Sequence, residues 1–191
     1  MARALRQDAA ERREAILAAA EIAFAEKGFN VPLEEVCTAA GVGRATLYRN
    51  FENRLALVHA IMSNNLDKLD RLVLEVGERP NALAAYLAEV LDQQVKTGGL
   101  VYLIGRDVQL DQNLTSRFKA HLAQLLDQAK AADLVRSDVT ADTVAIAVRM
   151  MWGGLDGLSF ADRKRSAPTV YNLCLAAIGL RQVSGSVEQR A

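Results

Sequence analysis

The residues of this sequence best suited to chemistry lie in one stretch, residues 33–51, and the chemistry they suit is nucleic-acid binding. An arginine can donate two hydrogen bonds to the edge of a guanine, whereas tyrosine and threonine hydroxyls suit phosphate oxygens. A short helix that exposes such groups on its outer face can enter the major groove of DNA. The side chains that fit this description are Arg44, Ala45, Thr46, Tyr48 and Arg49.

Two short helical segments joined by a tight turn must position these side chains. A helix-turn-helix needs small residues where the two axes approach each other, and Cys37, Ala39 and Ala40 supply them. Gly41 can adopt the positive φ that such a turn favours. The apolar residues that we expect to fix the crossing angle are Val36, Val42 and Leu47.

The charge of the chain is balanced overall but not in this stretch. Twenty-three basic and 23 acidic residues give a formal net charge of zero, which excludes a uniformly basic protein that coats nucleic acid. Residues 36–55 nevertheless contain three arginines and one acid, Glu52. A neutral protein therefore keeps a locally positive tip.

The spacing of apolar residues predicts helices throughout. Hydrophobic residues make up 51% of the chain, aromatic residues 5%, and there are three prolines, a composition typical of an all-α fold. We expect a first helix over residues 7–26 ended by Gly28, short helices over 32–40 and 44–50, and a long helix over 54–76. The apolar stripe that we expect the long helix to bury consists of Leu55, Val58, Met62, Leu66, Leu69, Val73 and Val76.

Beyond Pro80 the pattern predicts a bundle. Apolar residues at helical spacing fall within residues 83–91, 102–108, 114–129, 144–155 and 170–178. The basic run Arg163-Lys164-Arg165 is expected in the loop before the last of these helices. Residues 184–191 are expected to form a disordered tail.

Residues 13–57 resemble the DNA-binding domain of the tetracycline-repressor (TetR) family of regulators. The resemblance centres on residues 40–57, AGVGRATLYRNFENRLAL. Gly43 stands where the family usually has Ser, which removes a side-chain helix cap. Ala45, Asn50 and Arg54 stand where Gly, His and Lys are common.

The resemblance implies a role for each matching residue. Arg44, Ala45 and Arg49 would face base edges, next to Gly43 at the start of the helix. The residues that would hold phosphates are Thr46, Tyr48 and Arg54, and those that would pack inward are Leu47 and Phe51.

The resemblance also implies an architecture and partners. A three-helix DNA-binding domain, residues 1–53, would be joined by the long helix to a helical ligand-binding and dimerisation domain, residues 54–183. Two copies would pair through their last two helices and bind a palindromic double-stranded operator, from which a small molecule would release them. This predicts a ligand-responsive repressor. The alternative is an all-α small-molecule-binding or protein-interaction module without specific DNA binding, which would have no reason to keep the arginine, threonine and tyrosine face.

Six residues could line an apolar effector pocket, although aromatic residues at helical spacing also suit an ordinary core. They are Tyr86, Tyr102, Phe118, His121, Met151 and Trp152. His121 follows Phe118 by nearly one helical turn, and a hydrogen-bonded histidine of the core is the competing interpretation.

The sequence lacks the motifs that would indicate catalysis, cofactor binding or membrane insertion. No nucleophile elbow, zinc-binding histidine pair or phosphate-binding loop occurs, so we expect no enzyme, no cofactor and no metal. Cys37 and Cys174 lie far apart, which favours neither a disulfide framework nor a zinc site. With no apolar leader or membrane-length apolar run in the sequence, we expect a cytoplasmic protein.

Overall fold

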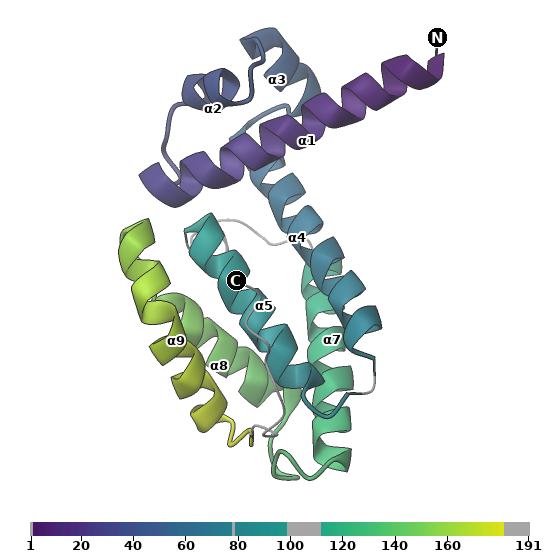
Figure 1. Cartoon of the computed structure of the whole chain (residues 1–191), viewed down its shortest axis with the longest axis vertical. Coiled ribbons are helices and arrows are strands. Elements are labelled where there is room, and N and C mark those ends of the chain that lie inside the picture. Colours follow the sequence, from purple (N-terminus) through teal and green to yellow (C-terminus); the bar gives the residue numbers. More distant parts are fainter. Residues whose placement is uncertain (1, 78, 99–111, 182–191) are drawn as a thin grey trace.

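The computed structural model of the chain describes residues 2–77, 79–98 and 112–181, with side chains from residue 7 onward. Within these ranges every regular element is a helix, which confirms the predicted all-α class (Figure 1). The helices are α1 (Ala2–Lys27), α2 (Leu33–Ala39), α3 (Arg44–Asn50), α4 (Arg54–Val76), α5 (Ala82–Thr97), α7 (Gln112–Ala131), α8 (Ala141–Gly153) and α9 (Phe160–Ala177).

Helices α1, α2 and α3 form an N-terminal unit at one end of the molecule (Figure 1). Its core joins residues of all three helices to the first turns of α4, where Leu57, Val58 and Ile61 are fully buried. The core of this unit therefore continues past the domain boundary that we propose at residue 53, into the start of the long helix.

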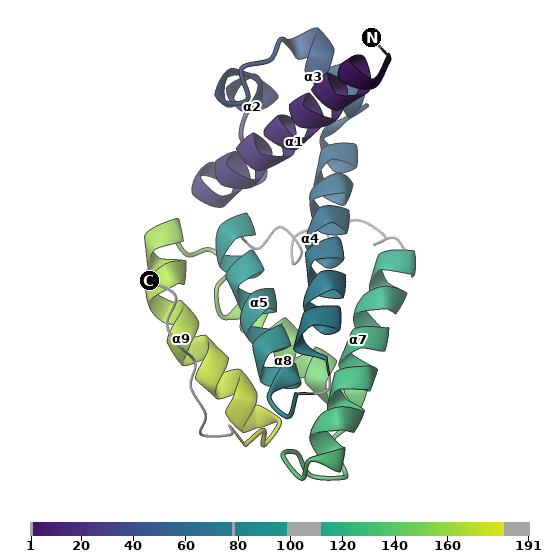
Figure 2. The same ribbon diagram turned by 45° about the vertical axis from the view of Figure 1, so that its right-hand side comes forward.

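Helix α4 links this unit to the bundle. Asn53 caps its start by accepting a hydrogen bond from the Ala56 amide at 2.9 Å. Figure 2 shows α4 running from the N-terminal unit down among the helices of the bundle. The predicted burial of Leu55 is wrong, since its side chain is 38% exposed. Because α4 passes from one core into another, its buried face shifts along its length instead of following a single stripe.

The remaining helices form the C-terminal bundle around α5. Helix α5 contacts α4, α7, α8 and α9, and also α1 of the N-terminal unit. Gly98 ends α5 with a φ of +67°, a left-handed conformation that glycine adopts without strain. The bundle therefore touches the N-terminal unit both through α4 and through the contact between α1 and α5.

Several helix boundaries in the structure differ from those that the sequence predicts. Helix α1 begins at Ala2 and not at residue 7. The run Arg163-Lys164-Arg165, expected in a loop, lies in α9, which starts at Phe160 and continues through Pro168. Ser159 caps α9 by accepting a hydrogen bond from the Asp162 amide at 3.2 Å, so the helix begins before its apolar spacing becomes regular. The helix expected over residues 102–108 and the tail expected over 184–191 lie outside the described residues.

Candidate nucleic-acid interface and ligand cavity

The turn between α2 and α3 has the geometry of a helix-turn-helix. Gly41 occupies the left-handed region with a φ of +65°, and the Val42 amide donates to the Cys37 carbonyl at 3.0 Å. Val36 and Leu47 are fully buried on the two sides of the turn. These contacts fix how α3 lies across α2, at the end of the molecule remote from the bundle (Figure 1).

The outer face of α3 is open to solvent. Arg44, Ala45, Tyr48 and Arg49 are exposed, and Thr46 is half-buried. Four of the side chains that the sequence predicts at the DNA therefore lie on one short helix with nothing packed over them in the described residues.

Two of these side chains have partners within the unit. Arg49 donates from Nη2 to the Thr46 hydroxyl at 3.0 Å, and Arg44 pairs with Glu34 of α2 at 2.6 Å. Both members of the Arg44–Glu34 pair are largely exposed, and such surface pairs contribute little. Arg44 can therefore exchange Glu34 for an anionic or polar partner at small cost.

The two ends of α3 and its buried side determine which face is free for binding. Gly43 stands at the N-cap of α3 with no side-chain cap, while Phe51 at the other end is buried beneath the Arg13 guanidinium, 5.1 Å from its ring. Leu47 and Phe51 thus point into the protein, which leaves the opposite face of α3 for binding.

Arg54, for which the resemblance implies a phosphate contact, makes several contacts within the protein. Its guanidinium is half-buried and donates to the Phe29 carbonyl and, at 2.7 Å, to the Val31 carbonyl. It also lies over the rings of Phe24 and Phe29, at 5.8 and 5.4 Å from their centroids. Arg54 thus holds the α1–α2 connection against the start of α4. The two bonds come from the two terminal nitrogens of the guanidinium, a spread that the single nitrogen of a lysine cannot reproduce.

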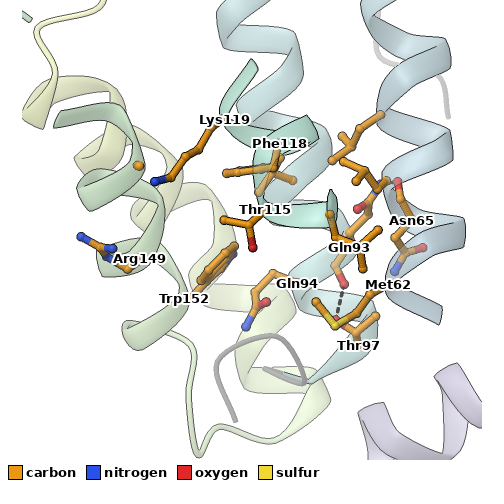
Figure 3. Close-up of a pocket in the computed structure, with 15 residues that line it drawn as sticks. Met62, Asn65, Gln93, Gln94, Thr97, Thr115, Phe118, Lys119, Arg149 and Trp152 are labelled. Atoms are coloured by element: carbon orange, nitrogen blue, oxygen red, sulfur yellow. Dashed lines mark hydrogen bonds between the residues drawn. The ribbon is translucent and has the colours of Figure 1, made fainter. Parts of the chain in front are cut away.

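A cavity of about 240 Å³ opens in the bundle between α4, α5, α7 and α8. Figure 3 shows it lined by Phe118 and Trp152 on one side and by polar side chains of α4 and α5 on the other. The two aromatic rings lie 6.4 Å apart. The other lining residues are Met62, Asn65, Leu66, Leu69, Val90, Gln93, Gln94, Thr97, Leu114, Thr115, Lys119, Ala145 and Arg149.

The six residues predicted at a pocket divide into three groups. Phe118 and Trp152 line the cavity. Tyr86, His121 and Met151 do not line it. Tyr86 is fully buried, and its ring lies 6.0 Å from that of Phe118. Tyr102 lies outside the described residues.

Sequence reasoning missed the polar residues of the cavity, of which Gln94 and Thr97 are both buried. They continue the buried face of α5 that includes Leu87 and Val90. The sequence contains a signal for Gln94, because it stands at a position of the helical stripe that is otherwise apolar. A buried glutamine costs free energy unless it has a hydrogen-bond partner, so such a residue indicates a polar contact or a ligand.

A polar network joins three helices beside the cavity. Tyr86 of α5 lies 3.2 Å from His121 Nδ1, and His121 Nε2 lies 2.9 Å from Asp70 of α4. A neutral imidazole with its proton on Nε2 fits both contacts, because it donates to Asp70 and accepts from Tyr86. Burial lowers the pKa of His121, aided by the nearby Arg117, and outweighs the opposing effect of Asp70.

Arg117 of α7 extends this network to two acids of α4. It pairs with Asp70 and, at 2.8 Å, with Asp67, and these hydrogen bonds raise its pKa. Phe118, the next residue, lines the cavity. The wall of the cavity is therefore directly connected to the helix that leads to the N-terminal unit.

Helices α8 and α9, which pack against each other, expose apolar side chains. Ile146 and Met150 lie one turn apart on α8 and are 49% and 65% exposed, and Leu173 of α9 is 65% exposed. Gly153 adds a position without a side chain near the end of α8. We refer to these four positions, Ile146, Met150, Gly153 and Leu173, as the α8/α9 face.

The part of the chain that the structure describes contains neither a candidate metal site nor a candidate membrane-spanning helix. No group of three or more His, Cys, Asp or Glu side chains is placed to hold a metal ion. No helix of the described ranges is long and apolar enough to span a membrane.

Two family models match the chain. Residues 16–61 match the family described as bacterial regulatory proteins, tetR family, and residues 79–171 match the family described as transcriptional regulator SbtR-like, C-terminal domain. A similar curated protein is the HTH-type transcriptional repressor BepR of Brucella suis, 27% identical over 93% of this chain and 81% of its own length.

Two solved structures are similar over most of their length. A TetR transcription regulatory protein from Mycobacterium vanbaalenii is 31% identical, with a TM-score of 0.62 over 80% of this chain and 99% of that chain. A TetR transcriptional regulator from Streptomyces coelicolor is 27% identical, with a TM-score of 0.66 over 89% of this chain and 99% of that chain.

Proposed function

The chain belongs to the tetR family of bacterial regulatory proteins, and from this premise we propose that it is a ligand-responsive repressor that binds a palindromic operator as a homodimer. The observation that carries the proposal is the exposed face of α3. Val36, Leu47 and Phe51 bury its inner side, while Arg44 and Arg49 remain open to a groove. Chromosomal DNA as the target also implies a cytoplasmic protein.

The α3 side chains divide into base contacts and phosphate contacts. Arg44 and Arg49, with Ala45 between them, would face base edges, because an arginine can bind guanine with two hydrogen bonds. Thr46 and Tyr48 would donate to phosphates. Arg54 would support them by fixing the start of α4, through its bonds to the Phe29 and Val31 carbonyls.

A homodimer would pair through the α8/α9 face. Its exposed apolar residues, Ile146, Met150 and Leu173, form a surface that a second copy can bury, and Gly153 allows a close approach of helices. Two α3 helices would then enter successive major grooves about 34 Å apart, which requires an operator with two-fold symmetry.

Effector release would run through α4. A molecule that enters the cavity contacts Phe118, whose neighbour Arg117 is paired with Asp67 and Asp70 of α4. A shift of α7 therefore pulls on the helix whose first turns belong to the N-terminal core. A coupling of about 1–3 kcal/mol would change operator affinity about 5- to 150-fold, and DNA would weaken the effector by the same factor.

The competing function is a helical binding module without specific DNA recognition, and a selection experiment separates the two. The purified chain is mixed with sheared genomic DNA of its host, and bound fragments are recovered and sequenced. A repressor enriches fragments that share a two-fold symmetric site, whereas the double variant Arg44→Ala/Arg49→Ala does not enrich them. Recovery of unrelated fragments by both proteins would contradict the proposal.

A further inference from the structure

Gln94 is the unusual member of the cavity wall. Its side chain is 2% exposed and lines the cavity, yet neither its amide nitrogen nor its amide oxygen has a hydrogen-bond partner in the described residues. A buried amide without partners is costly. A molecule in the cavity that both donates to and accepts from this amide would remove that cost.

The neighbouring polar groups are already paired within the protein. Thr97 donates to the Gln93 carbonyl at 2.8 Å, the bond drawn in Figure 3. Gln93 donates to the Asn65 carbonyl at 3.2 Å and to Glu89 at 3.1 Å. Gln94 therefore differs from the other two polar side chains of α5 that line the cavity, and its amide is the group left for a ligand.

The opposite side of the cavity is cationic. Lys119 of α7 and Arg149 of α8 line it as solvent-exposed residues, and Figure 3 shows both on the side away from Asn65 and Gln93. Neither makes an ion pair in the described residues, unlike Arg117 on the same helix as Lys119. No Asp or Glu is among the lining residues, so this side favours an anion.

Size and polarity limit the occupant further. Leu69, Phe118 and Trp152 are among the apolar residues that line the cavity. An engineered apolar cavity of about 150 Å³ holds benzene, so a volume of about 240 Å³ suits a molecule of about ten non-hydrogen atoms.

We propose that the effector is a small amphiphilic carboxylate: its acid group lies at Lys119 and Arg149, its apolar body packs against the two aromatic rings, and a hydroxyl group, which can both donate and accept, reaches Gln94. This inference rests on the proposed function, because it names the class of molecule that the regulator would sense.

Calorimetric titration of the full chain without DNA tests the inference with four probes of one chain length: octanoate, 8-hydroxyoctanoate, 1-octanol and octylamine. Octanoate should bind about tenfold more tightly than 1-octanol, because a hydrogen bond to a charged group is stronger than one between neutral groups. Octylamine should bind more weakly than either. The added hydroxyl of 8-hydroxyoctanoate should increase affinity several-fold over octanoate.

Single substitutions show which residue causes each difference in affinity between the probes. Lys119→Gln and Arg149→Gln should each weaken both acids about tenfold and leave 1-octanol unchanged, while Lys164→Gln, an exposed cation of α9 outside the cavity, should change nothing. Gln94→Leu should remove the advantage of 8-hydroxyoctanoate but retain octanoate binding, which also shows that the variant is folded.

Three results would overturn the inference: no binding of any probe at millimolar concentration, 1-octanol or octylamine binding as tightly as octanoate, or Gln94→Leu leaving the advantage of the hydroxyl intact. Because these titrations contain no DNA, they are independent of the regulator proposal. A chain that selects its operator but binds no carboxylate contradicts only this inference, and a chain that binds carboxylates but selects no operator contradicts only the proposed function.

Discussion

The buried guanidinium of Arg163 in α9 donates a hydrogen bond to the backbone carbonyl of Ala25, 138 positions earlier in the last turn of α1. Arg163 also donates to the Val95 carbonyl near the end of α5 at 3.2 Å and to the Leu158 carbonyl at 2.8 Å. A cation between the C-terminal ends of two helices is favoured by their dipoles. One side chain thus joins the bundle to the unit that carries α3.

Replacement of Arg163 should loosen this junction. Arg163→Met would leave the Ala25, Val95 and Leu158 carbonyls without their donor, so we expect the free energy of unfolding to fall by about 1–3 kcal/mol. Denaturant unfolding of the variant measures it. Arg165→Met, two residues away and paired only on the surface with Asp162, should cost less than about 1 kcal/mol. Equal losses for the two variants would show that the junction contributes no more than a surface pair.

Arg44 and Arg49 should contribute specificity. Arg44→Ala or Arg49→Ala should each cost about 1–3 kcal/mol of operator binding, with little change in affinity for unrelated DNA. Fluorescence anisotropy with operator and scrambled duplexes at one stated salt concentration measures both affinities. An equal loss on both duplexes would instead make that arginine a phosphate contact.

Arg54 should contribute stability and not DNA charge neutralisation. Arg54→Lys keeps the charge but cannot serve both the Phe29 and Val31 carbonyls in a fork, so we expect the free energy of unfolding to fall by about 1–2 kcal/mol. The log–log dependence of operator binding on salt should stay unchanged for Arg54→Gln. A decrease of its slope by about 0.9, with stability unaltered, would restore the phosphate contact implied by the family resemblance.

Stability should depend on pH through His121. Burial holds the pKa of His121 below its ordinary value of 6.5, so the unfolded chain binds a proton more readily than the folded chain. The contribution of this residue to the free energy of unfolding is therefore complete above about pH 6.5 and declines as the pH falls below it, by at most about 1.4 kcal/mol per pH unit. Urea unfolding from pH 7.5 to 5.5 measures it.

His121→Gln should flatten that part of the profile, and His59→Gln provides the matched control, because the chain has only these two histidines. An unchanged profile for His121→Gln would mean that the histidine titrates alike in the folded and unfolded chain.

Local signals predicted the N-terminal elements well. Gly41, Gly43 and Asn53 delimit α3 and the start of α4, and the structure confirms α3 as Arg44–Asn50 and α4 as Arg54–Val76. Each boundary depends on residues close in sequence, such as the Asn53 cap on the Ala56 amide. Helix periodicity and caps are therefore sufficient where local preferences decide the structure.

Features that depend on distant residues could not be predicted in this way. The run Arg163-Lys164-Arg165 lies between two stretches of regular apolar spacing, so the sequence predicts a loop there. The acceptors that bury Arg163 lie on α1 and α5, far away in the sequence. Leu55 was expected to be buried because a single stripe cannot show that α4 changes from one core to another. The family resemblance implies a phosphate contact for Arg54, and only the folded chain shows its bonds to the carbonyls of Phe29 and Val31.

Operator binding by α3 is tested most directly by a mobility shift of the purified chain on the promoter DNA flanking its own gene, at a stated salt concentration and with excess competitor DNA. We expect a discrete shift that resists the competitor, a two-fold symmetric footprint, and loss of both for Arg44→Ala/Arg49→Ala. A shift that the competitor abolishes, or one that the double variant retains unchanged, would contradict the assignment of α3 as the helix that reads an operator.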